Sequence, residues 1–139
     1  DGLVRHAIEL VREFDSGVPT ITVDKHKVIL VLVNLLQNAK HACEESGRPD
    51  KRLTVRLARQ DSRVTISVID NGVGIPPENL TRIFNHGFTT RKNGHGFGLH
   101  SSALAAREMG GALVVHSDGC GKGATFTLDL PLQPAANPA

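Results

Sequence analysis

The sequence predicts an α+β fold, a two-layer α/β sandwich in which helices cover one face of a mixed, mostly antiparallel sheet. Helical and strand patterns come in blocks, in the order α β α β β α α β β, and not in the strict alternation typical of a parallel sheet. The 139 residues, 40% hydrophobic and 22% charged, suit one soluble globular domain. We expect that domain over residues 1–131 and a Pro- and Ala-rich tail or linker over 132–139.

Hydrophobic periodicity predicts a helix, a short strand and a long helix in the first third of the chain. Apolar residues at helical spacing predict a helix over residues 2–14, and because no cap precedes it we expect the chain to be cut from a longer protein. A short alternating run predicts a strand over 19–23. Asp24 is the expected N-cap of a helix that continues to about Ser46. The apolar positions of the first helix are Leu3, Ala7, Leu10, Val11 and Phe14.

The remainder of the chain predicts two hairpins on either side of two helices. Alternating apolar residues mark the strands, and glycine-rich stretches without periodicity over 71–77 and 85–97 mark loops, the second long enough to be mobile. The expected elements are a strand pair at 53–57 and 64–68, a short helix at 78–84, a helix at 99–109 and a strand pair at 112–116 and 124–130.

Composition argues against several classes of protein. No apolar run reaches the roughly 18 residues that cross a bilayer, and no signal-peptide pattern opens the chain. A net charge of +2, with five Phe and no Trp or Tyr, argues against nucleic-acid binding. Cys43 and Cys120 have no paired spacing, which fits a reducing cytosol. Metal-site spacing is also missing among His86, His95 and His100.

Asp70 is the first candidate binding residue. It shares strand parity with the apolar residues before it, so its carboxylate is expected to face the helices, half-buried and in need of a donor. One interpretation is a strand-end carboxylate that caps the next turn, and the other is an acceptor for the exocyclic amine of a ligand. Gly72 and Gly74 favour the second interpretation, because two glycines one residue apart let the backbone approach a flat ring.

Asn34, Asn38 and His41 form a polar stripe on the long apolar helix, because they lie four and three residues apart. Asparagine is unfavourable inside a helix, so the two asparagines are expected to have a role. A carboxamide oxygen is a hard, neutral ligand that suits Mg²⁺ bound to phosphates. Hydrogen bonds from the asparagines to neighbouring loops are the alternative.

A third motif, Gly-His-Gly-Phe-Gly-Leu-His at residues 94–100, leads directly into a predicted helix. Small residues at a helix N terminus expose unpaired N–H groups and the positive end of the helix dipole, which together attract anions. No strand precedes the motif and no Lys-Ser/Thr pair follows it, so it is neither a Rossmann fingerprint nor a P-loop. It also lacks the accompanying motifs of Ser/Thr protein kinases.

These three motifs, in this order, resemble the ATP-binding domain of sensor histidine kinases, within the ATPase superfamily shared with DNA gyrase, Hsp90 and MutL. The resemblance covers about residues 3–131 and implies the superfamily's sandwich, the Bergerat-type ATP-binding fold. The matching segments are 34–42 (N box), 70–75 (first glycine box), 84–88 (F box), 94–99 (second glycine box) and 121–126 (closing Gly-x-Gly strand).

The resemblance implies which residues bind ATP and Mg²⁺. Asn38 would coordinate Mg²⁺, and Asp70 would accept a hydrogen bond from the adenine amino group. Backbone N–H groups at the start of the following helix would bind the phosphates beneath a lid formed by residues 85–97. In that lid, Arg91 and Lys92 would either reach the γ-phosphate or remain a solvated basic pair. The residues expected to contact the nucleotide are Asn34, Asn38, His41, Asp70, Gly72, Gly74, Ile75, Phe88, Arg91, Lys92, Gly94, His95, Gly96, Phe97, Gly98 and Leu99.

Two positions depart from the superfamily pattern. Hydrolytic members carry a Glu one helical turn before the magnesium Asn, where it activates water. Here Asn34 occupies that position, and an amide cannot take a proton from water at neutral pH. Ala124 replaces the Thr or Ser found after the last Gly-x-Gly of many relatives, and strand parity is expected to turn Ala124 inward and Thr125 outward. His6 lacks the Glu and Pro that follow the phosphoacceptor histidine of this family, so we expect a surface histidine there.

The resemblance therefore predicts a kinase module that donates the γ-phosphoryl group of ATP to a histidine on a separate dimerisation domain upstream. No residue of this chain is assigned as a catalytic base. A response-regulator receiver domain is the further expected partner. We expect a homodimeric full-length protein, a monomeric fragment and a catalytic domain on the cytoplasmic side. Two alternatives are a degenerate module that binds nucleotide or a partner without catalysis, and a hydrolysing ATPase of the same superfamily.

Overall fold

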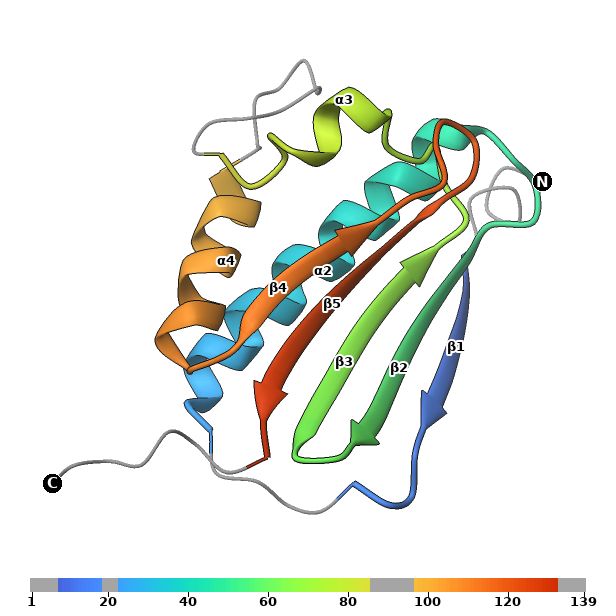
Figure 1. The fold of residues 1–139 in the computed structure, drawn as a ribbon. Helices are drawn as coiled ribbons and strands as arrows, with labels where there is room; N and C mark the ends of the chain where they lie inside the picture. Colours follow the sequence, from blue (N-terminus) through green and yellow to red (C-terminus); the bar gives the residue numbers. More distant parts are fainter. Residues whose placement is uncertain (1–7, 19–22, 86–96, 133–139) are drawn as a thin grey trace, which may run out of the picture.

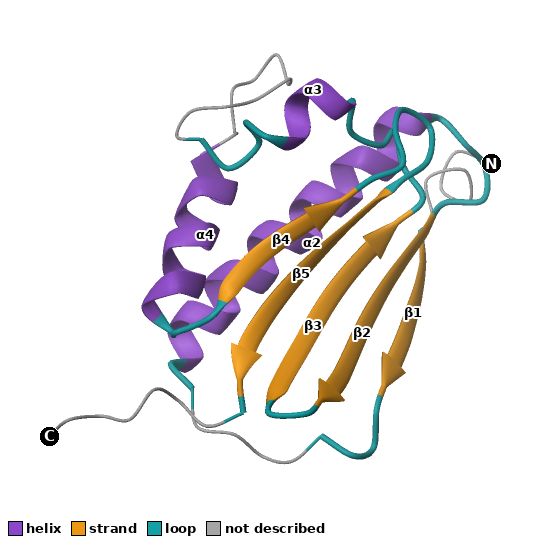
Figure 2. Ribbon diagram, in the orientation of Figure 1, coloured by secondary structure: helices purple, strands orange, loops and turns teal. Residues whose placement is uncertain are grey.

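The computed structural model describes residues 8–18, 23–85 and 97–132, which form one sheet with helices packed on one face (Figures 1 and 2). The five strands lie in the order β1-β2-β3-β5-β4. β1 runs parallel to β2, whereas every other neighbouring pair is antiparallel. The predicted α+β sandwich with a mixed, mostly antiparallel sheet is confirmed. Its elements are β1 (Glu9–Phe14), α2 (Lys25–Ser46), β2 (Arg52–Gln60), β3 (Arg63–Asp70), α3 (Pro77–Leu80), α4 (Phe97–Glu108), β4 (Ala112–His116) and β5 (Ala124–Pro131).

α2 is the longest helix and lies behind the sheet in the view of Figure 1. Asp24 caps it as predicted, because its side chain accepts a hydrogen bond from the Lys27 N–H. Gly47 ends it in the left-handed conformation, with φ 67°. A buried apolar stripe fixes the rotation of α2 against the sheet, and its members, four residues apart, are Val31, Leu35, Ala39 and Cys43.

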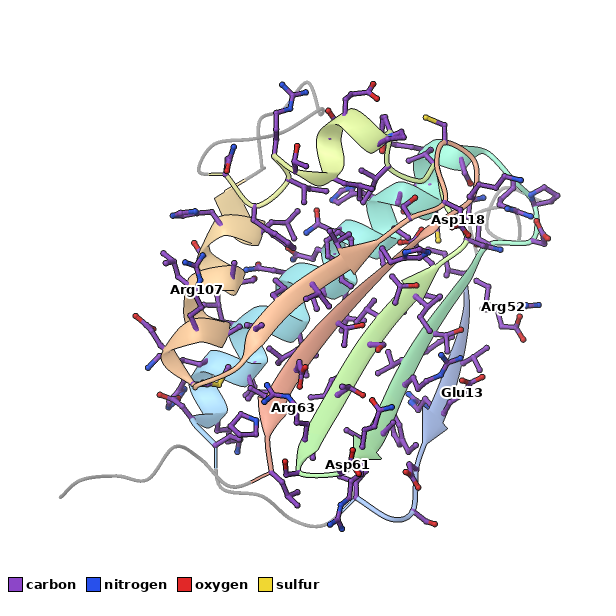
Figure 3. All side chains as sticks on the ribbon, viewed as in Figure 1. Glu13, Arg52, Asp61, Arg63, Arg107 and Asp118 are labelled. Atoms are coloured by element: carbon purple, nitrogen blue, oxygen red, sulfur yellow. The ribbon has the colours of Figure 1, made fainter. Side chains whose placement is uncertain are left out.

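The apolar core fills the space between the sheet, α2 and α4. The opposite face of the sheet is largely polar, and Figure 3 shows Glu13, Arg52 and Arg63 on that side. The charges on this face are paired across strands: Arg52 with Glu9 at 3.1 Å, Arg56 with Glu13 at 2.8 Å, and Arg63 with Asp129. In the described part of the chain, no helix is both long and apolar enough to cross a membrane.

The predicted helix over residues 2–14 is wrong in its described part, because Glu9–Phe14 forms the edge strand β1. The N–H groups of Glu9 and Asp15 donate to the carbonyls of Lys51 and Leu57, at 3.0 and 2.8 Å. Helical spacing over so short a segment is weak information, and pairing with β2 satisfies the backbone in a way that the local pattern does not reveal. Leu10 and Phe14 are 49% and 58% exposed, so the apolar residues on which the helix prediction rested are not core residues.

Two other boundaries differ from the predictions, and a third predicted element lies almost wholly outside the described residues. The helix expected over 78–84 is only the single turn α3. Tight turns follow it, in which the Arg82 N–H donates to the Asn79 carbonyl and the Asn85 N–H donates to the Arg82 carbonyl, each three residues earlier. α4 begins two residues before the expected position, so that Gly98 lies in its first turn. The strand expected over 19–23 falls outside the described residues except for Val23, which is not in a strand.

The assignment of β1 predicts different effects for two neighbouring proline substitutions. The backbone bonds of Glu9 and Asp15 show that odd-numbered N–H groups face β2, so proline at Val11 removes a ladder bond whereas proline at Arg12 removes an N–H that faces outward. We expect Val11→Pro to lower the free energy of unfolding by about 1–3 kcal/mol in urea titrations, and Arg12→Pro to cost distinctly less. Equal, large losses for both would contradict a strand and favour a helix.

Candidate functional site

A cavity of about 100 Å³ lies between α2, the C-terminal end of β3 and the first turns of α4. Five of the predicted nucleotide-binding residues line it, although they come from three separate motifs. The structure therefore brings together segments that are up to 61 positions apart, as the order of the motifs predicts. The five residues are Asn38, Asp70, Gly74, Ile75 and Leu99.

Asp70 lies at the end of the central strand, with its side chain on the helix-covered face and only 5% of the residue exposed. Its Oδ1 accepts a hydrogen bond from the Gly72 N–H at 2.8 Å. Burial raises the pKa of this carboxyl to about 6, and backbone hydrogen bonds from Gly72 and Ala124 act in the opposite direction. The cavity wall therefore carries a desolvated acceptor, for which a donor on a ligand is the natural partner.

The loop after Asp70 is held from both sides by close backbone contacts. A Cβ at Gly72 would lie 2.4 Å from the Ala42 carbonyl carbon of α2, and one at Gly74 would lie 2.0 Å from the Gly119 carbonyl oxygen. Gly74 also has a φ of 76°. The two glycines thus let the loop pack against α2 and the β4–β5 turn. Gly74 lines the cavity, whereas Gly72 lines a neighbouring surface crevice.

The asparagines of α2 are oriented by hydrogen bonds of their amide nitrogens. Asn38 Nδ2 donates to the Asn34 carbonyl at 2.8 Å, so a metal ligand at Asn38 would be its carboxamide oxygen. Asn34 lies one turn away from the cavity and contacts α4. The side chain of His41 is 51% exposed and lies 3.9 Å from Glu44, outside the cavity lining, and its nucleotide contact stays a prediction.

Other predicted site residues lie partly or wholly outside the described ranges. Phe97 is the first residue of α4, but its side chain is among those not described. Gly98 follows it, and its carbonyl accepts from Asn34. The lid expected over 85–97 therefore stays a prediction. The residues outside the described ranges are Phe88, Arg91, Lys92, Gly94, His95 and Gly96.

The structure adds residues that the sequence motifs did not identify as cavity lining. Ala42 and Glu45 continue the helical stripe of Asn38 at intervals of four and three, a signal that was available in the sequence. Ile83 comes from the tight turns after α3, which periodicity could not place. Phe126 faces the cavity beside the inward-facing Ala124, as strand parity predicts. Its ring packs edge-on against that of Phe84, with the two ring centroids 6.4 Å apart.

Helices cover one face of the sheet, and one cavity brings together a buried aspartate at a strand end, an asparagine on a helix and a helix that starts with glycine. This arrangement is that of a nucleotide-binding ATPase fold. Residues 23–134 match the family described as histidine kinase-, DNA gyrase B-, and HSP90-like ATPase. The chain belongs to this family.

The similar proteins are named as sensor proteins or as sensor histidine kinases. The chain is 34% identical over 96% of its length to the C4-dicarboxylate transport sensor protein DctS of Rhodobacter capsulatus, and 38% identical over 90% to the sensor protein ChvG of Agrobacterium fabrum. It covers 20% and 23% of these two proteins, so it spans about a fifth of the length of its relatives.

Solved structures agree with this placement. The catalytic domain of histidine kinase ThkA matches with a TM-score of 0.80 and 25% identity, over 95% of this chain and 84% of that one. Full-length ShkA in complex with AMPPNP matches with a TM-score of 0.78 and 30% identity, over 96% of this chain and 27% of that one. Within its family, the chain is thus an ATP-binding catalytic domain of the two-component sensor-kinase type.

The buried carboxylate predicts an unusual stability change for Asp70→Asn. The pKa of Asp70 is about 6 in the folded state and 3.8 in the unfolded state, so protonation of Asp70 stabilises the fold. This stabilisation is complete below pH 4 and is lost as the pH rises through 6. A neutral amide should therefore raise the free energy of unfolding of the nucleotide-free domain at pH 8, by up to about 3 kcal/mol, and by much less at pH 4.

Chemical denaturation of the wild type and the variant at both pH values measures this difference. Asp118→Asn is the matched control, because that side chain is 74% exposed; its stability should change little at either pH. A loss of stability in Asp70→Asn at pH 8 would show that the carboxylate has partners stronger than the two backbone N–H groups.

Proposed function

We propose that the chain is the catalytic module of a protein-histidine kinase, which binds ATP with Mg²⁺ and donates the γ-phosphoryl group to a histidine on a separate domain. The observation that carries the proposal is the cavity in which the buried Asp70 carboxylate, Asn38 and the first turn of α4 converge. The names of several similar proteins, which are described as sensor or histidine kinases, and the AMPPNP complex of the similar ShkA support the same function.

Adenine is the base that fits the inner end of the cavity. Asp70 offers an acceptor where adenine has its 6-amino donor, whereas guanine would bring a carbonyl oxygen against the carboxylate. Ile75, Leu99 and Phe126 supply apolar surface for the ring. A small aromatic ring system is therefore held by shape and by one charge-assisted hydrogen bond.

The phosphates belong at the other end of the site. The first N–H groups of α4 have no partners within the helix, and Leu99 in that turn lines the cavity. Asn38 is the proposed Mg²⁺ ligand through its carboxamide oxygen, and His41, which is exposed three residues further along α2, is a proposed contact at the edge of the site. Bound Mg²⁺ would neutralise phosphate charge. We also propose a lid whose residues contact the nucleotide, namely Phe88, Arg91, Lys92, Gly94, His95 and Gly96.

Phosphoryl transfer needs little covalent chemistry from this chain. An imidazole nitrogen of the acceptor forms the new bond to the γ-phosphorus, the bond to the bridging oxygen breaks, and ADP leaves, so the module must mainly position groups and neutralise charge. Hydrolysis needs a base beside water instead. Asn34 is an amide whose nitrogen is already used in hydrogen bonds to α4, which disfavours the hydrolysing alternative.

The context of the module is also proposed. The acceptor would lie on a dimerisation domain upstream, a response-regulator receiver domain would take the phosphoryl group next, and the parent protein would be a homodimer with this domain in the cytoplasm. We further propose that residues 1–131 form the ATPase domain, that 132–139 form a tail or linker, and that nucleic acid is not a partner.

The proposal predicts labelling in trans. Mixed with the separately expressed dimerisation domain of its own parent protein and γ-labelled ATP with Mg²⁺, the chain should label that domain with an acid-labile, base-stable phosphate, and should release inorganic phosphate only slowly. Asn38→Ala should lower the labelling rate about tenfold or more, and added Mg²⁺ should rescue it in part. Gln37→Ala, the exposed neighbour on α2, is the matched control and should label normally. Rapid phosphate release without labelling would place the chain among the hydrolases.

A further inference from the structure

Asn34 makes two hydrogen bonds between α2 and α4. Its Nδ2 donates to the Gly98 carbonyl at 3.0 Å and to Ser102 Oγ at 2.9 Å, across 64 and 68 positions of sequence. Ser102 is fully buried, with 0% of its surface exposed. A primary amide has two N–H donors, so this geometry uses both donors of Asn34 on the first turns of one helix.

Gly98 allows the two helices to approach closely at this point. A Cβ at Gly98 would lie 3.2 Å from Asn34 Cγ, so a larger residue would push the amide away from the carbonyl that it contacts. Gly98 is the second residue of α4, within the group of N–H donors that have no partner in their own helix. The Asn34 bonds therefore hold the N-terminal end of α4 and not its middle.

We propose that Asn34 is a positioning residue for nucleotide phosphates: its amide fixes the start of α4 against α2, at a set distance from Asn38 one turn along the same helix. This inference rests on the proposed function, because it assigns the phosphates to the α4 N terminus. It differs from the predicted direct contact of Asn34 with the cofactor, because the amide nitrogen of Asn34 already donates to α4. A donor held in place before the ligand arrives loses less entropy on binding.

The chemistry of the two bonds explains why an amide suits this position. A carboxylate accepts but cannot donate, so it would place negative charge against the Gly98 carbonyl oxygen and push the start of α4 away. A side chain at this position can therefore either act as a general base for water or donate a hydrogen bond to the Gly98 carbonyl, but not both. Asn34 donates the hydrogen bond, and the position then supplies no general base.

Binding measurements on Asn34→Asp test the inference, with adenosine as the ligand that lacks phosphates. We expect Asn34→Asp to weaken ATP binding about tenfold, with adenosine binding changed less than about twofold, because the contacts of Asp70 with the base are kept. The loss of ATP affinity should be the same in Mg²⁺ and in EDTA. Gln37→Asp makes the same chemical change at an exposed position of α2 and should leave both affinities unchanged.

Ser102→Ala is the second variant, and it removes one of the two acceptors with little change in volume. Ser102→Ala should weaken ATP binding about threefold and leave adenosine binding unchanged. The loss of ATP affinity in the double variant Asn34→Asp/Ser102→Ala should be smaller than the product of the losses in the two single variants.

Three results would overturn the inference while leaving ATP binding by the wild type intact. They are unchanged ATP affinity in both variants, an equal loss for adenosine and ATP, and a loss seen only with Mg²⁺, which would make Asn34 a direct contact of the metal. Failure of the wild-type chain to bind ATP would instead overturn the proposed function itself.

Discussion

The carboxylate of Asp70 is buried at the end of the central strand, and the arrangement of the site depends on how it is partnered. β3 carries it to the face beneath α2, where Gly72 and Ala124 donate backbone N–H groups that only partly offset its desolvation, so its pKa stays at about 6. A charged acceptor left in this condition costs folding stability, and a ligand amine can offset part of that cost on binding. The glycines around Asp70 matter because they let the loop, α2 and the β4–β5 turn close over it.

α2 links recognition of the base to placement of the phosphates. Its buried stripe sets the rotation of the helix, so that Asn38 reaches the cavity and Asn34 reaches the first turn of α4. His100 adds a second connection from that turn, since its Nδ1 lies 3.1 Å from the Phe84 carbonyl. The two ends of the site thus share a rigid helix, and a catalyst that acts by positioning benefits from this rigidity.

The sequence was sufficient where a strong local pattern determined the structure. α2 begins after its cap Asp24 and ends at Ser46, as expected, and strand parity placed Asp70 and Ala124 inward because side chains alternate along a strand. It was insufficient where contacts distant in sequence decided the outcome. Glu9–Phe14 became a strand through pairing with β2, and the partners of Asn34 lie more than 60 positions away. Gly72 was interpreted through the approach of the backbone to a flat ring, and the sequence alone did not show that it also packs against the backbone of Ala42.

Comparison of ATP with ITP, which has an oxygen in place of the 6-amino group, tests the central role of Asp70 most directly. Calorimetry at pH 8 should show ATP binding roughly 10- to 150-fold more tightly, as expected for one charge-assisted hydrogen bond. The ratio should fall as the pH drops below about 6, where Asp70 takes up a proton, and phosphate ionisation cancels in the ratio because both ligands carry the same triphosphate. Equal affinities for ATP and ITP at pH 8 would contradict the account, because the buried carboxylate would then contribute nothing to recognition of the base.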